Sequence, residues 1–121
     1  MSLGDTLLRY WGYDAFRSHQ QEVCEAAVSG RDALVLMATG SGKSLCYQVP
    51  AAWAHIEKRY DPRCGKPLGR VCVVVSPLVS LMEDQVAGLT SSGVPAVMLG
   101  GAHAGDHKLE QVRLPRASLF N

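Results

Sequence analysis

The sequence predicts an α/β domain in which a parallel sheet is covered by helices on both faces. Short apolar segments alternate along the chain with segments of helical pattern, and a glycine-rich turn joins the first apolar segment to a helix. Such alternation is typical of parallel sheets, because each crossover between parallel strands needs a helix-sized connection. The 121 residues, of which 47% are apolar, suffice for one compact domain with a hydrophobic core.

Two helices are expected before the first strand. The first runs from about Asp5, as its N-cap, to Trp11, and Gly12 ends it. The second follows a Ser18–Gln21 capping box and is closed by Gly30.

The first strand is expected over residues 32–37 ("DALVLM"), a short buried run that ends in a glycine-rich turn. A helix from about Lys43 to Glu57 follows. Pro50 lies inside this helix, where it removes the N–H that would bond the Cys46 carbonyl, so a kink is expected. Residues 58–70 have no hydrophobic period and are expected to form a loop.

The second half of the chain repeats the alternation. Residues 71–77 ("VCVVVSP") form the best strand candidate, and Ser76 and Pro77 supply an N-cap and a first-turn proline for a helix over about 78–92, closed by Gly93. Residues 95–100 ("PAVMLG") predict a third strand. A weaker helix is expected over 106–114, and residues 117–120 begin a strand-like segment.

The turn after the first strand has the composition of a phosphate-binding loop. Gly40 and Gly42 allow the backbone to turn successive N–H groups towards an anion, and the following helix adds its positive N-terminal end. Lys43 can reach the β- and γ-phosphates of a nucleotide, and the Ser44 hydroxyl can ligate Mg²⁺. The pattern G-x-x-x-x-G-K-S/T has Met37 in place of its first glycine, which implies a different entry into the loop but not the loss of the site.

Composition excludes little else. The formal net charge of +1 does not indicate a nucleic-acid partner, so such binding would need a local surface. The four cysteines are scattered without a C-x-x-C pair, and the four histidines have no metal-ligand spacing, so neither a zinc site nor a disulfide framework is expected. No secretory signal or apolar membrane span is present, and an intracellular location is the expectation.

Three stretches together resemble the RecQ family of DNA helicases. "MATGSGKSLCYQVP" is similar to the family's nucleotide-binding motif, "VVVSPLVSLMEDQV" to its motif Ia, and "YWGYDAFRSHQQEV" to its motif 0. Along the chain the motif 0 stretch comes first, then the nucleotide-binding motif and then motif Ia, which is the order in the family. Within the family, the sequence most resembles the Werner-syndrome-like branch. The resemblance implies that residues 1–121 are an incomplete N-terminal RecA-like ATP-binding domain of a nuclear 3′–5′ DNA helicase that acts in DNA repair and recombination.

Family roles can be carried onto the matching positions. Motif 0 implies an adenine site made by Tyr13, Arg17 and Gln20, where an aromatic ring stacks on the base and a glutamine amide pairs with it. The nucleotide-binding motif implies that ATP is held by residues 39–44, with Lys43 as the catalytic residue and Ser44 as a Mg²⁺ ligand. The members of that loop are Thr39, Gly40, Ser41, Gly42, Lys43 and Ser44. Motif Ia implies contacts to single-stranded DNA through the backbone of Ser76, Pro77, Leu78 and Ser80.

The chain also departs from the family. It contains no D-E-x-H sequence, which supplies the acidic groups for Mg²⁺ and water activation, and no second RecA-like domain with its arginine finger. We therefore expect negligible ATPase activity from this chain alone. Compared with the family, the loop over residues 58–70 is expected to be an addition, with five of the twelve Lys and Arg residues and one acid. It is either a solvated insertion or a contact for a partner or nucleic acid.

Two readings of the function stay open. The chain is part of a helicase, or it is a non-catalytic module that binds nucleotide or DNA and has no helicase activity. A small phosphate-loop enzyme such as a nucleotide kinase is disfavoured, because it would leave the motif 0 stretch unexplained.

Overall fold

The computed structural model describes residues 1–38, 40–56 and 71–99. The chain divides into two compact units, Met1–Cys72 and Val73–Asn121. The first contains α1 (Leu3–Trp11), α2 (Gln20–Val28) and α3 (Leu45–Ile56), and the second contains α4 (Val79–Ser91). The expected helix at 106–114, the loop at 58–70 and the segment at 117–120 lie outside the described residues.

Helix α1 begins earlier than expected, because Ser2 and not Asp5 is its N-cap. The Ser2 hydroxyl accepts the Asp5 N–H (3.0 Å), and the Asp5 carboxylate accepts the Ser2 N–H (2.8 Å), which completes a capping box. These bonds lower the pKa of the Asp5 carboxyl below its usual 3.8, the Ser2 backbone bond having the largest effect. The predicted terminator is confirmed: Gly12 has φ 72° and donates its N–H to the Leu8 carbonyl (2.9 Å).

Helix α2 does not use the expected Ser18–Gln21 capping box. Ser18 has φ 44°, and the N-cap is His19, whose side chain makes no capping bond. The helix starts instead at Gln20, whose side-chain oxygen accepts the Arg17 N–H (2.8 Å). The predicted end is confirmed by Gly30, which has φ 73° two residues beyond the last helical residue.

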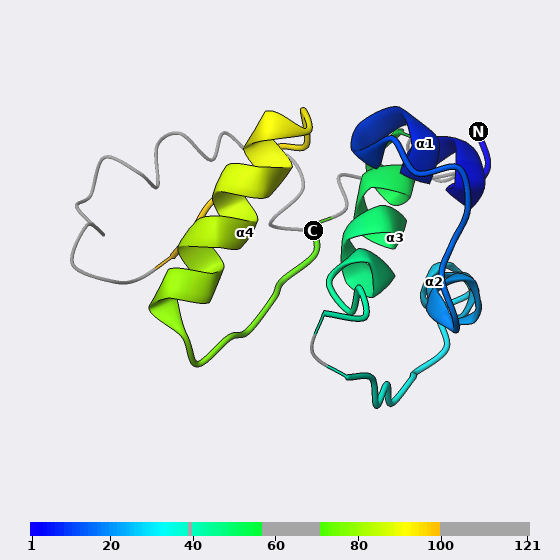
Figure 1. Ribbon diagram of the computed structural model, residues 1–121, viewed down its shortest axis with the longest axis horizontal. Helices are drawn as coiled ribbons and strands as arrows, with labels where there is room; N and C mark the ends of the chain where they lie inside the picture. Colours follow the sequence, from blue (N-terminus) through cyan, green and yellow to red (C-terminus); the bar gives the residue numbers. More distant parts are fainter. Residues whose placement is uncertain (39, 57–70, 100–121) are drawn as a thin grey trace, which may run out of the picture. The chain divides into compact units, whose positions relative to one another are not determined.

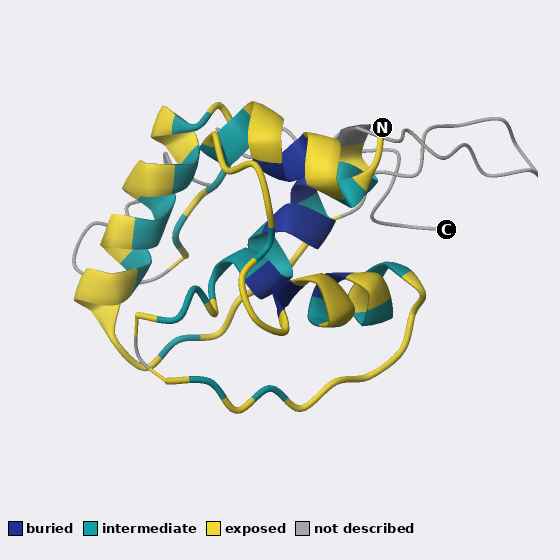
Figure 2. Ribbon diagram, turned by 45° about the vertical axis from the view of Figure 1, so that its right-hand side comes forward, coloured by how far each residue is buried: buried dark blue, intermediate teal, exposed yellow. Residues whose placement is uncertain are grey.

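Helix α3 is the central element of the first unit and packs against both α1 and α2 (Figure 1). Leu7, Cys24 and Val49, one from each helix, form the core and are at most 1% exposed. In Figure 2 the dark blue, buried parts of the ribbon lie on helices. The core residues are surrounded by partly buried hydrophobic side chains, namely Leu3, Trp11, Phe16 and Leu45.

Pro50 is accommodated inside α3, which continues as a helix from Leu45 to Ile56. The proline leaves the Cys46 carbonyl without its usual helical donor. The Cys24 thiol of α2 lies 3.8 Å from that carbonyl oxygen and 3.8 Å from the Leu45 carbonyl oxygen, within reach of a weak S–H···O bond. A side chain of the neighbouring helix thus partly replaces the lost backbone donor.

In the second unit, α4 starts later than expected. Its N-cap is Leu78, so Ser76 and Pro77 precede the cap. Ser76 still forms a hydrogen bond at the N-terminus of the helix, because its hydroxyl accepts the Leu78 N–H at 3.3 Å. None of the residues of α4 is buried, and Gly93, with φ 83°, follows its C-terminal end as expected.

The predicted strands are not confirmed. Among the described residues none is assigned to a β-strand, including those at 32–37, 71–77 and 95–99. The burial nevertheless alternates in the first of these segments: Val35 and Met37 are half-buried, whereas Leu34 and Leu36 are 90% and 88% exposed. This period of two is that of a strand with one covered face.

Candidate phosphate-binding site

The phosphate loop candidate leads directly into α3. Gly40 and Gly42 have φ 80° and 85°, values that favour glycine. Between them, the N–H and the hydroxyl of Ser41 both bond to the Ala38 carbonyl, which closes a tight turn. The backbone therefore adopts the left-handed conformations that the two glycines were expected to allow.

Lys43 and Ser44 form the turn immediately before α3, which begins two residues later than expected. The Ser44 carbonyl accepts the Gln48 N–H (3.0 Å), and the Lys43 carbonyl accepts the Cys46 N–H (3.1 Å). The side chain of Lys43 is exposed and that of Ser44 is half-buried. A cation and a hydroxyl thus stand at the positive end of a twelve-residue helix.

The residues expected to bind adenine differ in their burial and in their contact with the phosphate loop. Gln20 is buried, 1% exposed, and its Nε2 donates to the Gly42 carbonyl (2.9 Å), so it contacts the loop directly. Arg17 is joined to Gln20 through its backbone N–H, while its side chain is exposed. Tyr13 lies between α1 and α2 and is 50% exposed. Thr39 lies outside the described residues.

The residues expected to contact DNA belong to the second unit. Leu78 is 58% exposed, Pro77 and Ser80 are exposed, and Ser76 is half-buried. They precede or open α4, whose first-turn N–H groups have no carbonyl partner within the helix.

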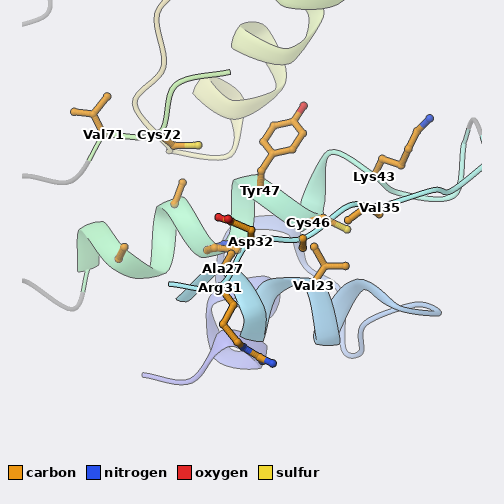
Figure 3. Close-up of a pocket in the computed structure, with 14 residues that line it drawn as sticks. Val23, Ala27, Arg31, Asp32, Val35, Lys43, Cys46, Tyr47, Val71 and Cys72 are labelled. Atoms are coloured by element: carbon orange, nitrogen blue, oxygen red, sulfur yellow. The ribbon is translucent and has the colours of Figure 1, made fainter. Parts of the chain in front are cut away.

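A separate apolar cavity of about 640 Å³ lies in the first unit. Helices α2 and α3 and residues 31–35 form most of its lining, and Lys43 is the one described residue of the phosphate loop that lines it. In Figure 3 the Lys43 side chain extends away from the other labelled lining residues.

Sequence reasoning missed the two contacts that α2 makes with the loop and with the start of α3. Gln20 and Cys24 are four residues apart and so share one face of the helix. The only signal for the second contact was Pro50, whose position implies a carbonyl in need of a donor. Burial raises the pKa of the Cys24 thiol to about 12, with a smaller effect of Cys46, so the thiol stays protonated as a donor.

In the described ranges, no group of three or more His, Cys, Asp and Glu side chains is arranged to hold a metal ion. The helices of these ranges are too short or too polar for any of them to cross a membrane.

Comparison with known proteins identifies the family. The sequence profile of the DEAD/DEAH box helicases matches residues 17–116, so the chain belongs to this family. Membership implies a RecA-like phosphate-loop fold. The match includes the loop, α2 and α3.

The similarity extends to RecQ helicases, as the three sequence motifs predicted. The chain is 44% identical over 98 residues, 81% of its length, to the ATP-dependent DNA helicase RecQ of Pasteurella multocida. It is 47% identical over 92 residues, 76% of its length, to RecQ of Haemophilus influenzae. It is 40% identical over 113 residues, 89% of its length, to the mouse bifunctional 3′-5′ exonuclease/ATP-dependent helicase WRN.

The chain spans 13% of the length of each of the two bacterial relatives and 7% of the mouse protein. The mouse protein is no more identical in sequence to this chain than the bacterial proteins are, so membership of the Werner-syndrome-like branch stays a prediction.

Proposed function

We propose that this chain binds Mg²⁺–ATP through residues 39–44 and is the ATP-binding part of a RecQ-like helicase that unwinds DNA in the 3′–5′ direction. The observation that carries the proposal is the turn with two positive-φ glycines, Gly40 and Gly42, placed directly before Lys43, Ser44 and α3. An anion bound there would meet backbone N–H groups, a lysine ammonium and a helix N-terminus together. Lys43 is the catalytic residue that this loop contributes.

The loop supplies only part of a Mg²⁺ coordination shell. Ser44 offers one hydroxyl ligand, and the remaining ligands would come from the nucleotide and water, as is usual for this ion. Bound Mg²⁺ would neutralise charge on the β- and γ-phosphates. We therefore assign Ser44 as the residue of this chain that binds Mg²⁺ in the nucleotide complex.

Adenine recognition is assigned to the α1–α2 connection. Half of the Tyr13 surface is exposed and so is the Arg17 side chain, which suits a stacking face and a cation beside a base. Gln20 joins this segment to the loop through its bond to Gly42. Tyr13 and Arg17 would hold the base, and selection of ATP over GTP by Gln20 would require its amide to exchange the Arg17 or Gly42 bond for one to adenine.

The DNA track is assigned to Ser76, Pro77, Leu78 and Ser80. Their exposure at the start of α4 is compatible with a phosphate of single-stranded DNA bound by first-turn N–H groups. A nuclear location and a role in DNA repair and recombination belong to the same proposal.

The proposed fold of residues 1–121 is a parallel sheet within a partial RecA-like domain. Residues 32–37, 71–77 and 95–100 are proposed as its strands. The support is the alternation of burial at Leu34–Met37 and at Val94–Leu99, together with apolar side chains on both faces of each segment. Leu34 and Leu36 would then be covered by another layer of the domain.

A fluorescent nucleotide tests the proposal. Mg²⁺–ATP should bind the chain, ATP should compete better than GTP, and Lys43→Ala should weaken binding by about tenfold or more. Arg31→Ala, a cation outside the loop, is the matched control and should leave the affinity unchanged. A wild-type chain that binds no nucleotide would refute the proposal.

The second candidate function is a nucleotide-binding module without helicase activity. It concerns the 121 residues by themselves, in which the loop, Lys43 and Ser44 would bind a nucleotide without a D-E-x-H sequence beside them. Hydrolysis measured in the same samples, with and without DNA, separates the two, because the module binds nucleotide without turnover. We expect negligible ATPase activity from the chain alone.

A further inference from the structure

The Gln20 side chain is held by the backbone at both of its polar ends. Its Oε1 accepts the Arg17 N–H at 2.8 Å, and its Nε2 donates to the Gly42 carbonyl at 2.9 Å. The residue is 1% exposed, so its amide is fixed within the protein and not by solvent. A glutamine amide has one carbonyl and one NH₂ group, and both are engaged here.

The contact with Gly42 fixes the orientation of one peptide unit of the loop. In the described residues every peptide bond is trans, and in a trans peptide the C=O and the following N–H point in opposite directions. The Gly42 carbonyl points towards Gln20, so the Lys43 N–H points away from Gln20. One hydrogen bond behind the loop therefore sets the direction of a donor on its opposite side.

Among the described residues, the Gln20 side chain fills the space on its side of Gly42. A Cβ atom placed on Gly42 would already overlap Gln20 Nε2, and Cys24 brings the same face of α2 against the start of α3. An anion must therefore approach from the opposite side, where the Lys43 N–H is directed.

We propose that Gln20 is a positioning residue for phosphate binding: by holding the Gly42 carbonyl, it aims the Lys43 N–H at the bound phosphate. The effect is independent of any base. This inference rests on the proposed nucleotide site and deepens it, because it gives Gln20 a role separate from adenine recognition. The ligand chemistry concerned is a di- or triphosphate group.

A base-free ligand separates the two roles of Gln20. Inorganic tripolyphosphate with Mg²⁺ offers the phosphate chain without adenine, and its affinity can be measured by titration calorimetry. Gln20→Met keeps the length of the side chain but removes both hydrogen bonds. Gln21→Met is the matched control, because Gln21 is exposed and its Nε2 donates within α2, to Glu25 Oε1 at 3.0 Å.

We expect Gln20→Met to weaken tripolyphosphate binding by about tenfold, the value of one well-oriented hydrogen bond to a charged group. Gln21→Met should bind like the wild type. Equal affinities for the two variants would overturn the positioning role while leaving the nucleotide site intact. A wild-type chain that binds no tripolyphosphate would instead overturn the proposed site itself.

A measurement on the unaltered chain covers the case in which Gln20→Met does not fold. In nuclear magnetic resonance spectra the side-chain NH₂ signal of Gln20 should shift when Mg²⁺–tripolyphosphate is added, because the ligand polarises the same peptide unit from its other side. The NH₂ signal of Gln21 should stay in place. Shifts in the loop amides without a shift of the Gln20 NH₂ signal would refute the inference.

Discussion

Replacing Gly42 by alanine should destabilise the first unit more than the same change at Gly40. The two glycines have nearly the same backbone angle, φ 85° and φ 80°. They differ in what a Cβ would meet: at Gly40 none of the described residues lies within 4 Å of it, whereas at Gly42 it would overlap Gln20 Nε2. The pair thus separates backbone strain from the loss of a specific contact.

The magnitude follows from these two contributions to the free energy of unfolding. A side chain at positive φ costs about 1–2 kcal/mol at either position. Gly42→Ala additionally displaces the Gln20 amide from the Gly42 carbonyl, and an unpaired buried polar group costs about 1–3 kcal/mol. Gly42→Ala should therefore cost about 2–5 kcal/mol and Gly40→Ala about 1–2 kcal/mol.

Urea unfolding followed by circular dichroism measures both values, provided that the denaturant slopes agree. In a Gln20→Ala background the obstacle to the new Cβ is gone, so the excess cost of Gly42→Ala should disappear. Equal costs for the two glycine variants in the wild-type background would refute the reasoning. So would an excess that persists without the Gln20 side chain.

Three further predictions concern the helices. Cys24→Ala should destabilise the chain by about 1 kcal/mol, because it leaves the Cys46 carbonyl without its donor. The loss of stability should be smaller in a Pro50→Ala background, where residue 50 again has a helical N–H. A double-mutant cycle that shows no coupling between the two changes would contradict this. The folded-state pKa of the Cys24 thiol is raised from 9.0 to about 12. The contribution of the protonated thiol to stability is therefore complete below pH 9 and is lost as the pH rises towards 12. Cys24→Ser should flatten the alkaline decline of the melting temperature relative to the wild type. The pKa of Asp5 is lowered from 3.8, so the difference in melting temperature between wild type and Asp5→Asn should be full above pH 3.8 and narrow below it; a difference that does not change with pH would contradict the capping-box account.

Helix ends were predictable where one residue decides the backbone. Gly12, Gly30 and Gly93 all have positive φ just beyond a helix, and glycine is the residue that adopts this conformation without steric cost. Helix starts were less predictable. Ser2 and Asp5 are both capping residues three positions apart, and the sequence does not show that Asp5 is the third helical residue of a capping box.

The start of α2 depended on a tertiary contact. Ser18 followed by Gln21 matches a capping box, but the helix begins at Gln20, whose side chain reaches the Gly42 carbonyl 22 residues away. Local pattern cannot contain that contact. The same holds for Cys24, whose thiol serves a carbonyl in another helix.

The candidate site could be proposed from its residue types, but the contacts that support it could not. Gly40, Gly42, Lys43 and Ser44 were recognisable because phosphate binding needs backbone turns, a cation and a hydroxyl in consecutive positions. The strand segments were recognisable as short apolar runs, but their pairing was not. A strand is defined by hydrogen bonds to a neighbour, which composition alone does not supply.

The most direct test of the central claim is a titration of the isotope-labelled chain with Mg²⁺–ATP, followed through the backbone amide signals. The account predicts that the largest shifts fall on Gly40–Ser44, with a strong downfield shift of the Lys43 N–H as it donates to a phosphate. Saturating Mg²⁺–ATP that leaves the Gly40–Ser44 amides in place would contradict the account.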